Sequence, residues 1–467
     1  MRLSGSDRLL RHDNSQASTR VAEAPRRLEQ FSQHSSAVNG PHVSTEKLLI
    51  SHSGPLHGKT SVSGAKNAVL PIMAACLLTE EPSIIENVPH VSDVILMIEI
   101  LRRLGVDVAF SGDRLTVTPG RYAGTVAPYE LVSRMRASIC VLGPLLARHG
   151  RAQVSMPGGC VIGPRPVDLH LKGMQALGAT IGIEHGYIVA TSTGLTGARI
   201  HLSGAFGSSV LATDNVMMAA VLAAGTTTIE HAACEPEVID LADFLIAMGA
   251  RIEGQGSPIM RIEGVHRLRG VRHRIIPDRI EAGTLMIATA VVGGDLTIED
   301  ARADHLGAVI DKLSEATVVV EKLNGSLRVH AKGPVQAVDV TTLPFPGFPT
   351  DLQAQMMALI AVSRGVSVLT EKVYPERFMH ISELNRMGAS ITREGSTAIV
   401  KGVSRLSGAP VTASDLRASA ALILAGLVAE NQTELSGLEH LERGYQDLET
   451  KLTQLGANIQ RIATGDA

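Results

Sequence analysis

The stretch Leu177-Gly178-Ala179 carries the pattern that decides the fold, because it marks where a helix ends and a strand begins. An apolar helix precedes it, and its glycine suits a helix C-cap in the left-handed conformation. The pattern returns at intervals of about 70 residues, in Leu104-Gly105-Val106, Met248-Gly249-Ala250, Met387-Gly388-Ala389 and Leu455-Gly456-Ala457, with a degraded copy at Glu315-Ala316-Thr317. From about residue 46 the chain is therefore predicted to contain six repeated units. The degraded copy lacks the glycine, and the sequence does not explain how its helix ends.

A second mark in each unit is an apolar, alanine-rich helix followed by a strand-like segment. Examples are residues 216–224 before 226–229, 285–292 before 295–298, and 356–362 before 366–369. Because these helices are apolar on nearly every side, they are expected to be buried. Six units of this size are too large and too few for a solenoid. We therefore predict an α/β fold with helices inside and sheets outside, grouped as three units plus three in two similar domains, with a ligand site in the cleft between them.

The bulk composition limits the partners of the protein. The chain has 467 residues, a net charge of −3, 3% aromatic residues and no tryptophan. This balance argues against nucleic acid or a charged membrane as the main partner. The four cysteines fit no zinc motif and suit a reducing cytoplasm. No apolar run reaches the roughly 20 residues of a spanning helix, so a soluble cytoplasmic protein is predicted.

Residues 1–45 differ from the rest of the chain. They are rich in Ser, Arg, Gln and His and contain no long apolar run. Such a segment buries too little apolar surface to fold, so a disordered extension is predicted. An organelle transit peptide is the alternative, and Asp7, Asp13, Glu23 and Glu29 count against it.

The candidate reactive residue is Cys160, in the stretch Pro157-Gly158-Gly159-Cys160-Val161-Ile162-Gly163-Pro164-Arg165. Its glycines and prolines indicate a loop, which would expose the thiol. Arg165 would draw the thiol toward the thiolate or hold an anion beside it. The alternative from these residues alone is a structural cysteine in a tight turn.

Other candidate residues lie at the expected starts of helices. Lys66 and Asn67 precede an apolar helix whose positive end favours an anion, although an ordinary capping turn explains them too. Arg136 lies at a helix start where a cation opposes the helix dipole, which suggests a bound anion. Asp351 leads another apolar helix, either as its N-cap or as a base facing the cleft.

Arginines in later connections complete the set of candidates. Asp415-Leu416-Arg417 leads a very apolar helix, and Arg377 and Arg443 lie in connections before later helices. Arginine binds carboxylate and phosphate bidentately, so these residues indicate a small substrate carrying phosphate or carboxylate groups. The chain has neither a Walker-type loop nor a dinucleotide fingerprint, so the anion is expected to belong to the substrate. No cofactor and no metal are predicted.

These residues fall in motifs by which the chain resembles the UDP-N-acetylglucosamine 1-carboxyvinyltransferase family, within the EPSP synthase-like superfamily of enolpyruvyl transferases. The likeness runs from about residue 46 to 462. Its motifs are Ser-Gly-Ala-Lys-Asn-Ala, Met-Arg-Ala-Ser-Ile, Pro-Gly-Gly-Cys-Val-Ile-Gly-Pro-Arg-Pro-Val-Asp-Leu-His, Phe-Pro-Thr-Asp-Leu-Gln-Ala-Gln, Arg-Phe-Met-His, Asp-Leu-Arg-Ala-Ser and Arg-Gly-Tyr. The resemblance implies a two-domain inside-out α/β barrel, with one domain at residues 66–276 and the other formed by 46–65 plus 277–467.

The resemblance also implies a reaction, in which the enolpyruvyl group of phosphoenolpyruvate moves to the 3-hydroxyl of UDP-N-acetylglucosamine and phosphate leaves. This is the first committed step of peptidoglycan synthesis. Cys160 would donate a proton and would be the residue alkylated by fosfomycin, while Asp351 would act as general base and Lys66 would assist. The implied phosphoenolpyruvate ligands are Lys66, Asn67, Arg165, Arg377, Arg417 and Arg443, with Asp415 in support. The implied UDP-sugar ligands are Arg136, Arg165, Pro166, Val167, Asp168, Leu169, Ser208, Ser209, Val210, Asp351 and Val373.

One turn departs from the family pattern. Many relatives carry a lysine where Gly207 stands and a glycine where Leu211 stands, in the turn that would bind the diphosphate. Loss of the lysine removes a cation, and leucine takes more room than glycine. Two alternatives therefore stay open: enolpyruvyl transfer to another uridine nucleotide such as UMP, as in nucleoside-antibiotic synthesis, and a catalytically silent paralogue that binds the nucleotide sugar.

Overall fold

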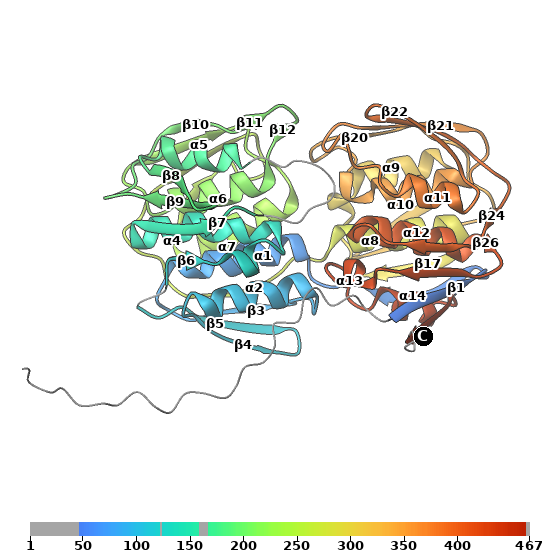
Figure 1. The fold of residues 1–467 in the computed structure, drawn as a ribbon, viewed down its shortest axis with the longest axis horizontal. Coiled ribbons are helices and arrows are strands. Elements are labelled where there is room, and N and C mark those ends of the chain that lie inside the picture. Colours follow the sequence, from blue (N-terminus) through green and yellow to red (C-terminus); the bar gives the residue numbers. More distant parts are fainter. Residues whose placement is uncertain (1–45, 122–123, 158–166, 464–467) are drawn as a thin grey trace, which may run out of the picture. The chain divides into compact units, whose positions relative to one another are not determined.

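The computed structural model describes residues 46–121, 124–157 and 167–463 (Figure 1). The predicted extension at residues 1–45 lies outside the described residues, as do Cys160, Arg165 and Pro166 of the candidate site. The roles of those three residues stay predictions.

In the described part of the chain there are six four-stranded sheets, all with the same plan. Each sheet contains one parallel pair of strands and two antiparallel pairs. In spatial order the sheets are β16 (Arg272–Arg274), β3 (Ser83–Glu86), β5 (Arg114–Thr118), β4 (Asp107–Ser111); β6 (Val126–Ala127), β7 (Arg151–Ser155), β9 (Tyr187–Thr191), β8 (Thr180–Glu184); β10 (Arg199–His201), β13 (Thr226–Glu230), β15 (Ile259–Glu263), β14 (Arg251–Glu253); β2 (Leu56–Ser61), β17 (Gly294–Glu299), β19 (Ser326–Ala331), β18 (Val319–Leu323); β20 (Val340–Thr342), β21 (Val366–Glu371), β23 (Thr397–Lys401), β22 (Ser390–Glu394); and β25 (Pro410–Thr412), β27 (Thr433–Ser436), β1 (Glu46–Ser51), β28 (Asn458–Ala463). Two short ladders pair β11 (Ser203–Gly204) with β12 (Gly207–Ser208) and β24 (Leu406–Ser407) with β26 (Ala429–Glu430).

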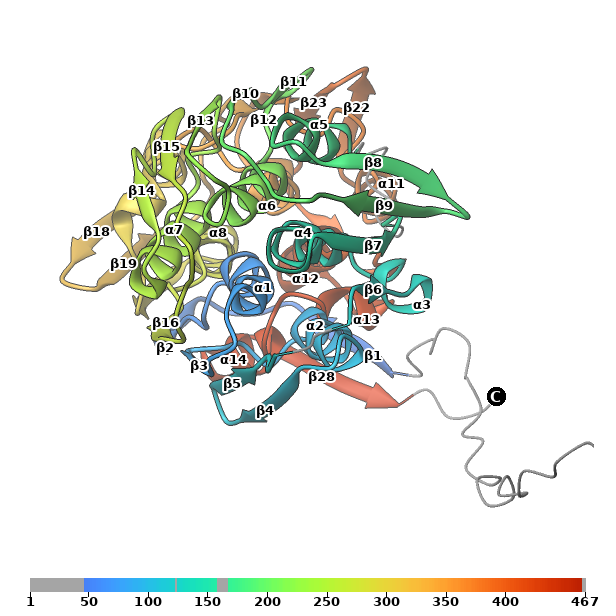
Figure 2. The same cartoon turned by 90° about the vertical axis from the view of Figure 1, so that its left-hand side faces the viewer.

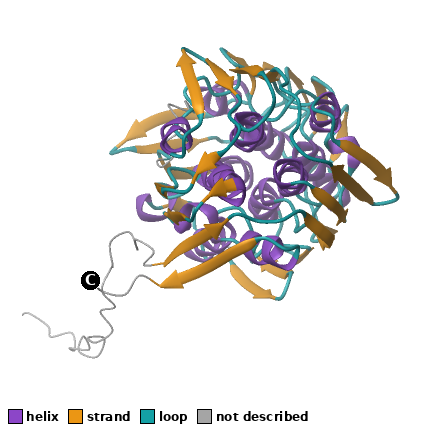
Figure 3. Cartoon of the chain, turned by 90° about the vertical axis from the view of Figure 1, so that its right-hand side faces the viewer, coloured by secondary structure: helices purple, strands orange, loops and turns teal. Residues whose placement is uncertain are grey.

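The apolar helices lie inside these sheets. The mostly buried ones are α1 (Lys66–Ala75), α4 (Leu142–His149), α6 (Val210–Ala220), α8 (Arg279–Val292), α10 (Gln353–Ala361) and α12 (Leu416–Val428). Helix α4 packs on α6, and α10 packs on α12. Figure 2 shows α1, α4 and α6 together with the strands outside them, and Figure 3 shows helices gathered centrally from the opposite side. The predicted arrangement of buried helices and peripheral sheets is confirmed.

The remaining helices are shorter or only partly buried. Each unit has a second helix besides its buried one. These second helices are α2 (Ser92–Arg103), α5 (Asp168–Ala176), α7 (Pro236–Met248), α9 (Gly307–Glu315), α11 (Ile381–Arg386) and α14 (Leu448–Gln454). Two more are single turns, α3 (Tyr129–Val132) and α13 (Leu438–Leu441). The 3₁₀ turns are η1 (Cys76–Leu78), η2 (Arg136–Val141), η3 (Ala303–His305) and η4 (Thr350–Leu352).

Helix α6 begins earlier in the structure than the apolar pattern predicted, because its first turns contain buried polar residues. Helix α6 begins at Val210, six positions before the apolar run that predicted it. Its first turns contain Thr213, Asp214 and Asn215, all at most 1% exposed. The apolar pattern marks only the part of the helix without polar side chains, so it set the start too late.

The fourth unit ends its outer helix without glycine, at Thr317. In the other five copies a glycine takes a positive φ, between 85° at Gly105 and 110° at Gly249. Thr317 has φ of 72°, and the amide of Val318 donates to the carbonyl of Leu313 at 2.9 Å. These are the features of a left-handed helix C-cap. The alignment of Ala316 with the glycines was therefore wrong by one residue, because threonine takes the glycine position.

Thr317→Gly is expected to stabilise the protein by about 1 kcal/mol, since a β-branched residue with positive φ is strained. The unfolding midpoint in urea, at fixed pH, measures the effect. Gly388→Thr is the matched control at the equivalent position of the next unit, where φ is +89° and no atom lies within 4 Å of an added Cβ. It should lower the midpoint, and a fall for Thr317→Gly would contradict the strain argument.

Two hydrophobic clusters organise the described core. One includes buried residues from Ala65 to Ile275, and the other joins Leu48–Val62 to residues 280–457. The two stretches that pass between the clusters pair with each other, because the amide of Ala65 donates to Ile276 at 2.8 Å and that of Asp278 donates to Ser63 at 2.8 Å. The division into two domains at these places stays a prediction.

Candidate active site

A cavity of about 430 Å³ contains most of the predicted ligands. Its lining comes from residues 66–237 and 279–443 and includes ten of the site residues predicted from sequence. These are Lys66, Asn67, Arg136, Val210, Asp351, Val373, Arg377, Asp415, Arg417 and Arg443.

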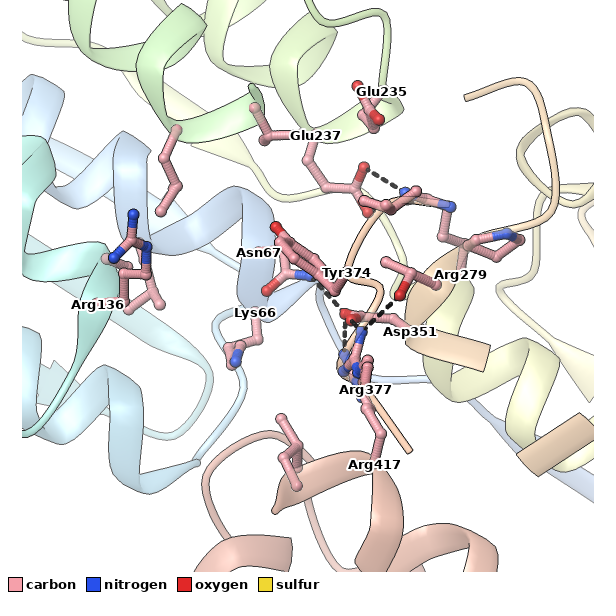
Figure 4. Close-up of a pocket in the computed structure, with 18 of the residues that line it drawn as sticks. Lys66, Asn67, Arg136, Glu235, Glu237, Arg279, Asp351, Tyr374, Arg377 and Arg417 are labelled. Atoms are coloured by element: carbon pink, nitrogen blue, oxygen red, sulfur yellow. Dashed lines mark hydrogen bonds and ion pairs between the residues drawn. The ribbon is translucent and has the colours of Figure 1, made fainter. Parts of the chain in front are cut away.

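Asp351 lies at the centre of the polar contacts in this cavity. Its Oδ1 accepts from Arg377 at 2.7 Å, and its Oδ2 accepts from Arg417 at 2.8 Å and from Asn67 Nδ2 at 3.4 Å. Figure 4 shows Asn67, Arg377 and Arg417 all directed at this carboxylate. The N-cap alternative is wrong, since Leu352 caps α10 and no side chain bonds to the helix start. The side chain thus faces the cavity, as a base would have to.

The arginines set the acidity of Asp351. Burial raises the pKa of its carboxyl group, but the positive charges of Arg417 and Arg377 outweigh burial and hold the pKa well below its ordinary value. In this state Asp351 is ionised and has little tendency to take up a proton.

Asp415 positions one of these arginines by capping a helix. Its Oδ1 accepts from the amides of Arg417 and Ala418 at 2.8 and 3.1 Å, which satisfies the start of α12. Arg417 is only 2% exposed, and its guanidinium carbon lies 5.1 Å from the centre of the Tyr445 ring. Nε and Nη1 of Arg417 are buried and have no hydrogen-bond partner in the described structure.

A second carboxylate, Asp93, joins two further cations. Lys66 Nζ lies 3.1 Å from Asp93 Oδ2, and Arg443 Nε lies 3.0 Å from Oδ1. Lys66 is the first residue of α1, so its amine lies near the positive end of that helix. Sequence reasoning missed Asp93, because an aspartate at the start of α2 resembles an ordinary helix-start residue. Asp93 thus brings Lys66 and Arg443 together in the lining of the cavity.

An acidic group on α7 was also missed. Glu237 binds Arg279 through two contacts of 2.9 and 3.2 Å, and Glu235 accepts from the amide of Phe345 at 3.3 Å. The residues Glu235, Glu237 and Arg279 all line the cavity. Burial raises the pKa of Glu235 despite the nearby Arg279 charge. Only the geometry reveals this group, since the sequence shows an ordinary acidic helix start.

Five predicted UDP-sugar ligands do not line the cavity in this structure: Val167, Asp168, Leu169, Ser208 and Ser209. Ser209 is the N-cap of α6, where its hydroxyl accepts from the amide of Ala212 at 3.3 Å. The roles of these residues stay predictions. Of the two positions that depart from the family pattern, Gly207 has φ of 96°, which disfavours any side chain, and Leu211 lines the cavity.

Buried histidines predict how stability depends on pH. Burial, with the charge of Arg136, lowers the pKa of His170 to about 3, and burial lowers that of His305 to about 4. The unfolded chain binds protons at these groups below about pH 6.5, whereas the folded chain does so only near pH 3–4. Stability is therefore expected to fall as pH drops from about 6.5 to 4.

The replacement His170→Asn should reduce that slope by up to about 1.4 kcal/mol per pH unit. Urea unfolding at several pH values between 7 and 4 gives the slope. Asparagine can still accept the 3.1 Å contact from the Asn215 amide, so packing should be preserved. An unchanged slope would mean that His170 does not titrate on unfolding.

The described residues contain neither a cluster suited to a metal ion nor a helix suited to cross a membrane. No group of three or more His, Cys, Asp or Glu side chains in this part of the chain is placed to hold a metal ion. None of the helices at 46–121, 124–157 and 167–463 has the length and apolar character that a membrane crossing would require.

Comparison with known proteins places the sequence and fold of this chain in a family of enzymes. Residues 50–452 match the sequence model for EPSP synthase (3-phosphoshikimate 1-carboxyvinyltransferase). The chain therefore belongs to the EPSP synthase family of enolpyruvyl transferases. An EPSP synthase structure from Acinetobacter baumannii, 18% identical, has a TM-score of 0.69 over 89% of this chain and 100% of its own, which supports the fold alone. The predicted inside-out α/β barrel is thus confirmed.

The chain is more similar in sequence to relatives whose names state a particular activity. UDP-N-acetylglucosamine 1-carboxyvinyltransferases from Methylacidiphilum infernorum and Caldanaerobacter subterraneus subsp. tengcongensis are each 52% identical to this chain, over 89% of its length and 99% of theirs. The structure of the enolpyruvyl transferase NikO from Streptomyces tendae is 27% identical, with a TM-score of 0.80 over 89% of this chain and 98% of its own.

Proposed function

We propose that this protein transfers the enolpyruvyl group of phosphoenolpyruvate to the 3-hydroxyl of UDP-N-acetylglucosamine and releases phosphate, the first committed step of peptidoglycan synthesis. The observation that carries this is the 52% identity, along nearly the whole of both chains, to UDP-N-acetylglucosamine 1-carboxyvinyltransferases. The partners are these two small substrates, with neither nucleic acid nor membrane among them. We place the reaction in the cytoplasm.

The cations of the cavity support binding of phosphoenolpyruvate. Lys66 and Arg443 both line the cavity beside Asp93, and cationic side chains of this kind suit a phosphate group. Arg417 has two donors without a protein partner, which suit a carboxylate or phosphate oxygen. Arg165, from outside the described residues, would add to this set, as the family resemblance implies. Val210, Arg136 and Val373 line the cavity and would contact the nucleotide sugar.

The proton transfers follow from the proposed roles of Cys160 and Asp351. The Cys160 thiol donates its proton to the methylene carbon of phosphoenolpyruvate, and the sugar hydroxyl oxygen bonds to the adjacent carbon. Asp351 takes the hydroxyl proton. The tetrahedral adduct then expels phosphate, and one methyl proton returns to the Cys160 thiolate, which restores the double bond.

Substrate binding would also make Asp351 a better base. In the present structure Arg377 and Arg417 hold the Asp351 pKa well below its ordinary value. An anionic substrate that takes hydrogen bonds from these arginines weakens their hold on the carboxylate and so raises its pKa. The base would thus gain strength when phosphoenolpyruvate is bound.

A second acceptor deserves a direct test, because Leu211 lines the cavity in the turn that would hold the diphosphate. The alternative is enolpyruvyl transfer to a uridine nucleotide such as UMP. Phosphate release from phosphoenolpyruvate is measured with UDP-N-acetylglucosamine and, in parallel, with UMP, before and after fosfomycin. Fosfomycin-sensitive release with the UDP-sugar alone supports the proposal, and release only with UMP changes the acceptor.

The same assay addresses a catalytically silent paralogue and the role of Cys160. No release with either acceptor would favour the paralogue. Cys160→Asp keeps a group able to donate a proton but removes the thiol, so it should keep some turnover and resist fosfomycin. Inhibition of this variant by fosfomycin would contradict the assignment of Cys160 as the alkylated residue.

A further inference from the structure

Glu371, at the end of β21, is a fully buried carboxylate that lies outside the cavity lining. Its Oε1 accepts from the hydroxyl of Thr342 at 2.6 Å and from the amides of Val373 and Tyr374, both at 2.8 Å. Its Oε2 accepts from the hydroxyl of Thr350 at 2.9 Å. All four bonds run toward the carboxylate oxygens, so hydroxyl and amide donors satisfy both oxygens.

These bonds connect Glu371 to the proposed base through one hydroxyl. Thr350 donates to Glu371 and accepts from Arg377 Nη1 at 3.1 Å. The same Nη1 donates to Asp351 at 2.7 Å. Glu371 therefore orients the Thr350 hydroxyl so that its lone pair faces Arg377, and this second contact fixes where the guanidinium meets Asp351.

The two oxygens of Glu371 serve different parts of the cavity wall. Three donors hold Oε1, and two of them are the backbone amides of Val373 and Tyr374, residues that line the cavity. Oε2 has the one contact with Thr350, on the side of Asp351. A change confined to Oε2 should therefore disturb the Asp351 side and leave the Val373 turn in place.

We propose that Glu371 is a positioning residue for the reaction, one that sets the Arg377–Asp351 pair through the hydroxyl of Thr350. The proposal rests on the proposed function, in which Asp351 takes the proton of the acceptor hydroxyl. A side chain outside the cavity lining then controls how well the base is aligned.

Glu371→Gln tests this at a single atom. The three donors around Oε1 require the amide oxygen, so the NH₂ group must take the place of Oε2. That group donates to the Thr350 hydroxyl where the carboxylate accepted from it, so the hydroxyl must turn its hydrogen elsewhere and share its two lone pairs between the new amide and Arg377. We expect kcat for phosphate release to fall roughly 10- to 100-fold, with KM for UDP-N-acetylglucosamine within about twofold of the wild-type value.

A double-mutant cycle with Thr350→Val separates positioning from general damage. If Glu371 acts through Thr350, Glu371→Gln should have little further effect on kcat in the Thr350→Val background. Equal effects in both backgrounds would overturn the proposed route. A rise in KM with unchanged kcat would also overturn it, because Glu371 would then serve only the Val373 turn.

Ser367→Ala is the matched control for lost stability. Ser367 is fully buried on the same strand, and its hydroxyl accepts from the amide of Val338 at 3.1 Å. This variant should lower the urea midpoint and keep kcat, and a comparable kcat loss would refute a specific role for Glu371. Wild-type protein that releases no phosphate with either acceptor would overturn the proposed function and this inference with it. Active wild type with an unchanged Glu371→Gln variant would overturn the inference alone.

Discussion

Asp351→Asn is expected to lower turnover by roughly 10²- to 10⁴-fold and the free energy of unfolding by about 3–5 kcal/mol. The amide keeps the shape of the side chain but cannot accept the proton. It also removes the charge that both Arg377 and Arg417 contact, and their side chains are only 6% and 2% exposed. Two buried cations would then lie close together without that carboxylate. Phosphate-release kinetics and urea unfolding measure the two effects.

Added inorganic phosphate tests whether the loss of stability comes from the two arginines that Asp351 contacts. Freed from Asp351, the two arginines can bind an anion, so phosphate should raise the unfolding midpoint more in the variant than in the wild type. Asp295→Asn is the charge-matched control, because Asp295 pairs with Arg328 in a contact exposed to solvent. It should change neither turnover nor the response to phosphate. Unimpaired turnover in Asp351→Asn would remove Asp351 from the role of base.

Lys66→Met is expected to raise KM for phosphoenolpyruvate about 10- to 100-fold, the value of one or two lost charge-assisted hydrogen bonds. Methionine keeps the apolar length of the side chain but has no charge. Binding of the nucleotide sugar should change much less, since Arg136 and Val210 remain. Initial rates of phosphate release, with each substrate varied in turn, separate the two constants. Equal changes in both would indicate a general distortion of the cavity.

The variant Asp93→Asn should shift the same constant in the opposite direction. Asp93 bonds to both Lys66 and Arg443, so its loss removes one carboxylate that competes with the substrate for these cations. KM for phosphoenolpyruvate should fall, while the unfolding midpoint also falls because the cations lose their buried partner. A rise in KM would show that Asp93 holds the two side chains in place more than it competes for them.

The sequence predicted the architecture because the fold repeats itself. Each unit repeats the same sequence features, which are an apolar helix, a strand and, in most copies, a glycine at a helix end. Six copies make each feature easier to recognise. The one misplaced copy is informative. Thr317 adopts the conformation that glycine adopts elsewhere, and no propensity rule assigns threonine to that position.

The site was predictable only in part, for a physical reason. Arginines and a lysine near helix starts are unusual enough to be noticed, and the family motifs supply their proposed roles. Asp93 and Glu371 are acidic residues at ordinary element ends, and their importance lies in what they touch. Asp93 and Arg443 are 350 positions apart in the chain, so only the folded structure brings them together.

The way β1 and β2 are used affects the order in which the protein is built during translation. These strands are made first, yet β2 pairs with β17, and β1 pairs with β27 and β28 near the end of the chain. Once a ribosome has produced residues 65–275, the hydrophobic cluster of these residues can complete itself, while the two early strands wait with unpaired edges. The first described residues are thus among the last to find their partners. A nascent chain stalled before β17 would carry both strands with their edges unpaired.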